Sequence, residues 1–213
     1  MNGGRCPGNG VELPAAPSSF HDMPVALVVL VLAAGWRIAA IHLPGLANVT
    51  PLMALVLCGA VYFPARRLWL APLAALVLSD LYLDQHYAAA GDTWVWTSAL
   101  VRTLCFAAAI PLGLAVARRR SWGSLLAATL TGSVLFYLAT NTDAWLRDPA
   151  YLKTAAGWWQ AMTVGRPEFP PTLLFFRNTL AGDLVFTALF AGAMEFAARR
   201  AGRPGALAGR AAA

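Results

Sequence analysis

The sequence has little charge. Only 12% of its 213 residues are Asp, Glu, Lys or Arg, whereas 59% are hydrophobic and the mean hydropathy is +0.59. Because a soluble domain carries about 25% charged residues, this composition excludes an ordinary soluble globular protein. Long apolar runs separate the few charges, and this arrangement is typical of a polytopic helical membrane protein.

The sequence also lacks the short motifs of several protein classes. Its three cysteines, Cys6, Cys58 and Cys105, form no closely spaced pair, which excludes a disulfide framework and a zinc motif. It contains no Walker A, GxSxG or strand-linked GxGxxG pattern. The chain therefore has no ATPase of its own, and active transport would require an energising partner.

Six hydrophobic runs determine the predicted fold class. They cover residues 24–43, 52–63, 68–83, 94–117, 121–140 and 171–196. We predict an all-α membrane domain of six transmembrane helices at residues 23–198, with disordered tails at 1–22 and 199–213. Loops are expected at 42–51, 84–93 and 141–170, and the last of these is long enough to act as a lid.

The basic residues predict the orientation of this domain. They cluster at one side of the predicted membrane, as Arg66-Arg67, Arg118-Arg119-Arg120 and Arg199-Arg200. Basic loops stay in the cytoplasm, so both termini are predicted to be cytoplasmic, in the inner membrane of a bacterium. The same distribution favours the lipid bilayer over nucleic acid as the partner of this chain.

Ionisable residues inside the runs are the best candidates for function, because a charge in a bilayer core costs several kcal/mol. Glu195 lies at the inner end of its run and is assigned to the interface beside Arg199. The remaining five lie in the outer half or near the middle of the membrane, namely Arg37, Asp80, Arg102, Arg177 and Asp183. Three are positive and two negative, so pairing among them leaves one arginine for a carboxylate, phosphate or amide group of a ligand.

Polar residues of neighbouring runs and loops complete the predicted pocket. Asn48 and Thr50 either cap the second helix or fold over the mouth of the pocket. Trp145 belongs to the predicted lid, although tryptophans on the outer side are also typical of an interfacial belt. The predicted substrate-binding residues are Arg37, Asn48, Thr50, Asp80, Arg102, Asn141, Trp145, Arg177, Asn178 and Asp183.

An ordered set of motifs across residues 35–192 carries a family resemblance. The set is Arg37, Asn48-Val-Thr-Pro51, Gly59-Ala-Val-Tyr62-Phe63, Ser79-Asp80, Phe136, Thr140-Asn141, Trp145, Tyr151, Gly157, Phe175-Phe176-Arg177-Asn178 and Gly182-Asp183. It resembles a family of small bacterial integral membrane proteins of unknown function. The family itself implies no activity.

Six spans, cytoplasmic termini and an outward pocket are also similar to the substrate-binding S-components of energy-coupling-factor vitamin transporters. This resemblance implies that a vitamin binds at the outer face and that transmembrane and ATPase subunits supply the energy. Some members act without a dedicated module, including small cobalamin transporters in which a cysteine can ligate cobalt. Cys58 and His86 are the candidates for such a contact. Cobalamin would be the transported ligand, since no resident cofactor or other metal site is predicted.

Three functions are compatible with these residues. The leading hypothesis is a substrate-binding component for vitamin uptake, with cobalamin as the first ligand to test. The second is an intramembrane enzyme that acts on a lipid or cofactor through Asp80 and Asp183, although no catalytic residue is assigned. The third is a membrane scaffold whose buried charges only pair with one another.

Overall fold

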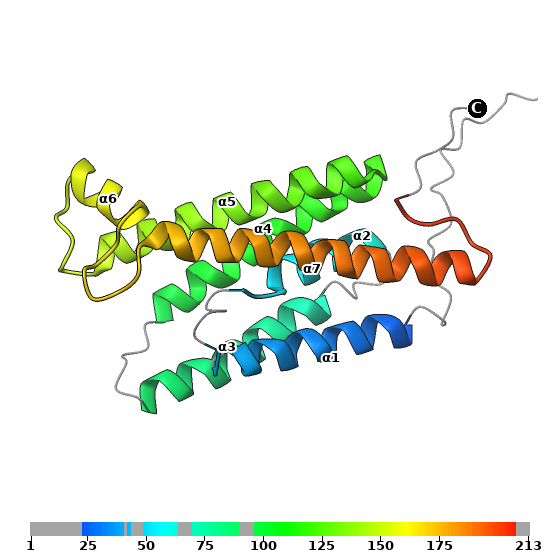
Figure 1. Ribbon diagram of the computed structural model, residues 1–213, viewed down its shortest axis with the longest axis horizontal. Helices are drawn as coiled ribbons and strands as arrows, with labels where there is room; N and C mark the ends of the chain where they lie inside the picture. The colour runs from blue at the N-terminus through cyan, green and yellow to red at the C-terminus, as the bar shows by residue number, and fades with distance from the viewer. Residues whose placement is uncertain (1–22, 41, 44–48, 64–69, 90–95, 208–213) are drawn as a thin grey trace, which may run out of the picture.

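The computed structural model describes residues 23–40, 42–43, 49–63, 70–89 and 96–207. Within these ranges the chain forms seven α-helices and no β-strand, which confirms the predicted all-α class (Figure 1). The helices are α1 (Met23–Ala40), α2 (Leu52–Tyr62), α3 (Leu70–Ala89), α4 (Trp96–Arg119), α5 (Trp122–Arg147), α6 (Ala155–Met162) and α7 (Thr172–Arg200).

Three helical segments among the described residues are long and apolar enough to cross a membrane. They are Ser98–Arg119 in α4, Trp122–Arg147 in α5 and Thr172–Arg200 in α7. The length and composition of these segments are consistent with a membrane protein. Each of the six predicted runs overlaps one of the helices α1 to α5 and α7, whereas α6 was not predicted.

Two predicted boundaries are wrong. Residues 84–89 were assigned to a polar loop, but they form the last part of α3. Helix α5 was expected to end near residue 140, but it continues to Arg147. Neither segment contains glycine or proline, and polar side chains alone do not end a helix. The first proline after α5 is Pro149, just beyond the observed end.

Helix α2 occupies the centre of the bundle, between α4, α5 and α7 on one side and α1 and α3 on the other (Figure 1). All 11 of its residues are buried. A helix of this length spans only about 16 Å, which is too short to cross a bilayer alone. Its apolar surface therefore packs against protein in every direction.

Three glycines allow the neighbouring helices to approach α2 and the segment before it. A Cβ on Gly113 of α4 would lie 2.7 Å from Ala60 Cβ and 2.8 Å from a carbonyl oxygen of α2. A Cβ on Gly132 of α5 would lie 2.7 Å from Met53 Sδ, and one on Gly182 of α7 would lie 3.2 Å from the backbone nitrogen of Thr50. Small residues at such contacts are the usual means of close helix packing in membranes.

The chain turns sharply at the end of the bundle opposite α6 (Figure 1). Arg120 has a φ of 51° between α4 and α5, and the Ser121 hydroxyl accepts a hydrogen bond from the Ser124 backbone N–H at 3.1 Å. At the same end α7 stops at a left-handed Gly202 with a φ of 67°. Residues 203–207, within the region assigned to the C-terminal tail, turn back so that Leu207 is buried.

The close contact at Gly113 gives a stability prediction. Gly113→Ala should lower the free energy of unfolding by about 1–3 kcal/mol, because its methyl group collides with the backbone of α2. Gly192→Ala on α7 is the matched control, since a Cβ there meets nothing within 4 Å. This control should gain up to about 1 kcal/mol from helix propensity. Thermal unfolding in detergent measures both variants, and equal midpoints would contradict the packing of α2 against α4.

Candidate functional site

Arg37, Asp80 and Arg102 meet between α1, α3 and α4. Arg37 donates a hydrogen bond to Ser79 Oγ at 2.6 Å and forms an ion pair with Asp80 Oδ1. The other oxygen of Asp80 accepts from Arg102 Nε at 3.4 Å. The side chains of Arg37 and Asp80 are about 10% exposed, so this contact is largely removed from solvent.

Asp84 is a further member of this cluster that sequence reasoning missed. It follows Asp80 by one helical turn on α3 and accepts from Arg102 Nη2 at 3.2 Å. The cluster therefore contains two positive and two negative charges. The predicted excess of one arginine among the five charges did not count the carboxylate of Asp84, which was assigned to a loop. Its spacing of four residues from Asp80 was the available signal.

A further ion pair lies beside this cluster, on α5 where it faces α4. Arg147 pairs with Asp143 one turn earlier on α5 and donates to Ser98 Oγ on α4. Asp143 Oδ2 also accepts a hydrogen bond from Ser98 at 3.3 Å. Ser98 lies one turn before Arg102 on α4, so polar contacts continue from α1 through α3 and α4 to α5. We call the group Arg37, Ser79, Asp80, Asp84, Ser98, Arg102, Asp143 and Arg147 the ion network.

A separate polar pocket lies between α5 and α7. It has a volume of about 190 Å³ and combines hydroxyl and amide groups with aromatic rings. The rings of Tyr137 and Phe176 are in contact, with centroids 4.4 Å apart. The residues that line this α5–α7 pocket are Phe136, Tyr137, Thr140, Asn141, Thr172, Phe175, Phe176 and Thr179.

The end of α6 and the turn after it border this pocket. The Tyr137 hydroxyl donates to the Met162 carbonyl, and the Leu173 backbone N–H donates to the Thr163 carbonyl at 3.1 Å. Gly165 has a φ of 71°, and a Cβ there would lie 2.5 Å from Thr172 Oγ1. The connection between α5 and α7 is thus fixed against the two helices that form the pocket.

The predicted lid is held to α5 by further hydrogen bonds. Trp145 Nε1 donates to the Leu152 carbonyl at 2.8 Å, and Trp158 Nε1 donates to Thr142 Oγ1 at 3.0 Å. Tyr151 lies in this connection, outside the helices, and burial raises the pKa of its hydroxyl. The tryptophans therefore anchor the connection rather than line the α5–α7 pocket.

The predicted site residues do not form one cluster. Asn141 lines the α5–α7 pocket, where its Nδ2 also donates to the Tyr137 carbonyl at 2.8 Å. Arg177 is exposed on α7 and donates to Asn178 Oδ1 at 3.4 Å, outside the lining of this pocket. Thr50 is half-buried beside Gly182. Asn48 and the side chain of His86 lie outside the described residues.

Asp183 is buried away from the ion network. It is 2% exposed, and its Oδ2 accepts a hydrogen bond from Ser133 Oγ at 2.6 Å. Among the described residues no basic side chain pairs with it, in contrast to Asp80, Asp84 and Asp143. The prediction placed this carboxylate in a common pocket with Arg37 and Arg102, but Ser133 of α5 is its observed partner.

Glu195 was set aside as an interfacial charge, and this assignment is wrong. Its side chain is 5% exposed and accepts hydrogen bonds from the Tyr62 hydroxyl at 3.0 Å and from the Leu207 backbone N–H at 2.9 Å. Depth along a helix does not show which face a residue occupies, and Glu195 occupies the face of α7 that packs on α2. The turn after α7 covers it.

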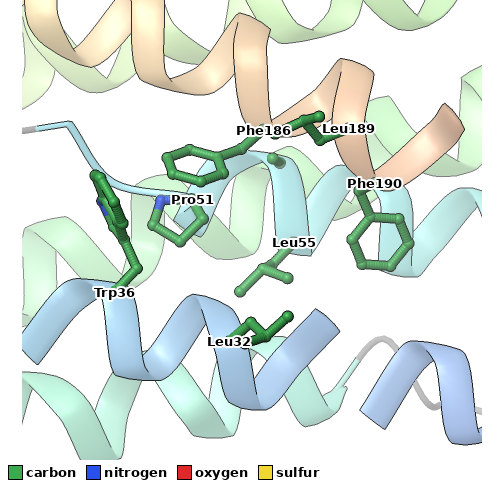
Figure 2. A pocket seen from close by; sticks show the side chains of 8 residues that line it. Leu32, Trp36, Pro51, Leu55, Phe186, Leu189 and Phe190 are labelled. Atoms are coloured by element: carbon green, nitrogen blue, oxygen red, sulfur yellow. The ribbon is translucent and has the colours of Figure 1, made fainter. Parts of the chain in front are cut away.

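A larger cavity of about 310 Å³ lies between α1, α2 and α7 (Figure 2). Apolar side chains form nearly all of its wall, including Leu32, Leu55 and Phe190. The one polar hydrogen at its edge, on Trp36 Nε1, donates to the Val49 carbonyl at 2.8 Å. This cavity provides no hydrogen-bonding group that would orient a polar ligand.

The described residues do not form a metal centre. No group of three or more His, Cys, Asp or Glu side chains that could hold a metal ion occurs among the described residues. Cys58, the candidate for a cobalt contact, is fully buried in α2, and its sulfur lies 4.0 Å from the Thr187 carbonyl. It does not line the α5–α7 pocket.

The ion network predicts a strong dependence of stability on Asp80. Asp80→Asn should lower the free energy of unfolding by about 3 kcal/mol, because two arginines lose their shared charge partner in a largely buried site. Asp84→Asn should cost only about 1 kcal/mol, since Asp84 pairs with one arginine and is more exposed. Thermal unfolding in detergent compares the two.

A double variant separates the ion pair from other effects. Asp80→Asn combined with Arg37→Gln should cost less than the sum of the two single changes, because the second change removes a charge that the first leaves unpaired. Strict additivity would show that Arg37 and Asp80 are not coupled.

Comparison with known proteins places the chain in a family but not in a functional class. Neither the curated proteins nor the solved structures include a match to it. The model of a family of unknown function, DUF6580, matches residues 18–206 and therefore nearly the whole chain. The chain belongs to this family of unknown function, DUF6580.

Proposed function

We propose that the protein is a substrate-binding membrane component of an uptake system, of the S-component type, and that the α5–α7 pocket holds the ligand. The observation that carries the proposal is the composition of this pocket. Hydroxyl groups, one amide group and aromatic rings together line a cavity of about 190 Å³. Ligand sites typically have this mixture of aromatic surface and a few polar groups that fix orientation.

The proposal includes six membrane-crossing helices, α1 to α5 and α7, with both termini in the cytoplasm of a bacterium. Two of the arginine clusters support this orientation. The turn between α4 and α5 and the end of α7 lie at the same end of the bundle, opposite α6 (Figure 1). Basic residues at one end are the usual mark of the cytoplasmic side. The α5–α7 pocket and α6 would then face outward, where an uptake component receives its ligand.

The ligand that fits best is small, planar and without a strong charge. The cavity is smaller than the roughly 300 Å³ at which most ligand pockets begin. Its aromatic rings suit stacking and its hydroxyl and amide groups suit hydrogen bonds to a heterocycle. Arg37 and Arg102 are engaged by carboxylates elsewhere, so they do not recognise this ligand. A corrinoid such as cobalamin is far larger than the cavity, and smaller ring vitamins are therefore the first ligands to test.

A membrane scaffold is the second candidate, and the ion network favours it. In this network Arg37, Arg102 and Arg147 all pair with carboxylates, and the hydrogen bonds of Ser98 add α5 to the contact among α1, α3 and α4 without any ligand. This network is explained by structure alone. A scaffold role does not account for the α5–α7 pocket, so it remains the second choice.

Binding to the purified protein tests the proposed function. We expect pyridoxine, a small, planar and neutral ring vitamin, to bind, with thiamine and biotin as charged comparisons and riboflavin and cobalamin as larger ones. Asn141→Ala should weaken that binding by up to about tenfold, because it removes a hydrogen-bonding group worth about 0.5–1.5 kcal/mol from the pocket. Isothermal titration calorimetry in detergent measures both.

The control for this experiment is Thr131→Ala, which removes an exposed hydroxyl from α5 outside the pocket and should leave the affinity unchanged. If no compound of the panel binds while the protein remains folded, the uptake function is contradicted and the scaffold becomes the better explanation. Equal affinities of Asn141→Ala and Thr131→Ala would instead place the ligand outside the α5–α7 pocket.

A further inference from the structure

A row of polar residues runs along the buried face of α7. Members four residues apart lie on one side of a helix, so the row follows the axis from Thr179 to Thr187, and Ala191 separates Thr187 from Glu195. Helix α5 carries a matching row with the same spacing. On α7 the row is Thr179, Asp183, Thr187 and Glu195, and on α5 it is Asn141, Tyr137, Ser133 and Thr129.

The two rows make hydrogen bonds across the contact between the helices. Ser133 Oγ donates to Asp183 at 2.6 Å, and Thr129 Oγ1 lies 3.4 Å from Thr187 Oγ1. Ser133, Thr129 and Thr187 are fully buried. Hydroxyl groups can both donate and accept a hydrogen bond, so such a row can pass a proton from one group to the next.

Helix α2 extends this row to Glu195. The Cys58 sulfur lies 4.0 Å from the Thr187 carbonyl. One turn further along α2, the Tyr62 hydroxyl lies 3.3 Å from the Ala191 carbonyl and 3.0 Å from Glu195 Oε1. We call the polar groups from Thr179 to Glu195, with their partners on α5 and α2, the polar seam.

Each end of the polar seam reaches a distinct place in the fold. Thr179 and Tyr137 line the α5–α7 pocket, one turn away from Asp183 and Ser133 respectively. At the other end the turn after α7 covers Glu195, and a Cβ on Gly205 would lie 1.6 Å from Glu195 Oε2. The seam therefore connects the pocket with the opposite end of the bundle.

The two carboxyl groups of the seam differ from the other buried acids. Among the described residues no basic side chain pairs with Asp183 or Glu195, whereas Asp80, Asp84 and Asp143 all pair with arginine. The group that contacts Asp183 is the Ser133 hydroxyl on α5, and those that contact Glu195 are Tyr62 on α2 and the Leu207 N–H. An unpaired charge in a membrane interior is costly, and acids in this position are therefore candidates for a function.

We propose that the polar seam is a proton pathway through the centre of the bundle, from the α5–α7 pocket to Glu195. Asp183 takes up a proton from the pocket, and its carboxyl releases one to the hydroxyls of the seam. Each hydroxyl accepts one proton and gives up another, so no net charge stays behind. About 12 Å of α7 separate Thr187 from Glu195, and the Cys58 thiol and the Tyr62 hydroxyl of α2 lie along this interval. Glu195 then releases one proton for each proton that Asp183 takes up.

Proton flux into vesicles tests this pathway without knowledge of the ligand. The full-length protein is reconstituted into liposomes that contain pyranine, and valinomycin with a potassium gradient imposes a membrane potential. Wild-type vesicles should acidify faster than protein-free vesicles. Asp183→Asn, which preserves the shape of the side chain, should reduce the excess rate by about tenfold or more.

A matched pair of threonines on α5 provides the control. Thr129 and Thr131 both donate to the carbonyl four residues earlier, but only Thr129 lies in the polar seam. Thr129→Val should slow the flux, whereas Thr131→Val should not. A wild-type rate equal to that of empty liposomes, or equal rates for wild type and Asp183→Asn, would overturn the proposal.

A labelling experiment on the wild-type protein covers the case in which Asp183→Asn does not fold. Dicyclohexylcarbodiimide reacts with protonated carboxyl groups in membranes, and peptide mass spectrometry locates the product. We expect modification of Asp183 and none of Asp80, which is held by two arginines. Absence of label on Asp183 would overturn the proposal. Vitamin binding is measured separately, so failure of the ligand panel and failure of the proton pathway remain distinguishable.

Discussion

The complete burial of α2 is the constraint on which the rest of the structure depends. A helix of 11 residues cannot cross a bilayer, so its backbone and side chains must be enclosed by longer helices. Gly113, Gly132 and Gly182 make this possible, because each removes a side chain where α4, α5 or α7 approaches α2 or the segment before it. The same contacts hold α5 and α7 at the separation at which Ser133 reaches Asp183. The position of α2 thus sets the geometry of both the α5–α7 pocket and the polar seam.

The bundle separates its buried polar groups into two systems with different electrostatics. On the side of α1, α3 and α4, every carboxylate of the ion network has an arginine within reach, and the charges cancel locally. On the side of α5 and α7, the described residues pair no arginine with Asp183, and the Ser133 hydroxyl donates to it instead. Paired ions in low dielectric are held in place by strong attraction, which suits helix packing. A carboxyl among hydroxyls has no such partner, which suits exchange of a proton or contact with a ligand.

The sequence alone was sufficient to predict the all-α class and a helix in each of the six apolar runs, because a long hydrophobic run is a strong local signal. It also singled out Arg37, Asp80 and Arg102, which the fold brings together. It did not reveal that Asp84 belongs to the same cluster, because a polar stretch without glycine or proline was taken as a loop. Glu195 was misjudged for a different reason: position along a helix gives depth, whereas only packing shows that this face of α7 meets α2. The common site predicted for Arg37 and Asp183 failed because pairing between helices depends on their arrangement, which no local pattern encodes.

The polar seam bears directly on how an uptake protein of this size would be energised. The sequence contains no nucleotide-binding motif, so energy must come from partner subunits or from an ion gradient. One proton that crosses a potential of 100 mV supplies about 2.3 kcal/mol, which corresponds to roughly a 50-fold accumulation of a neutral ligand. Coupling requires that the proton and the ligand share a structural element. Thr179 and Tyr137 meet this requirement, because both line the α5–α7 pocket and each stands one turn from the Ser133–Asp183 hydrogen bond. A ligand that moves either residue would also move the entrance of the seam.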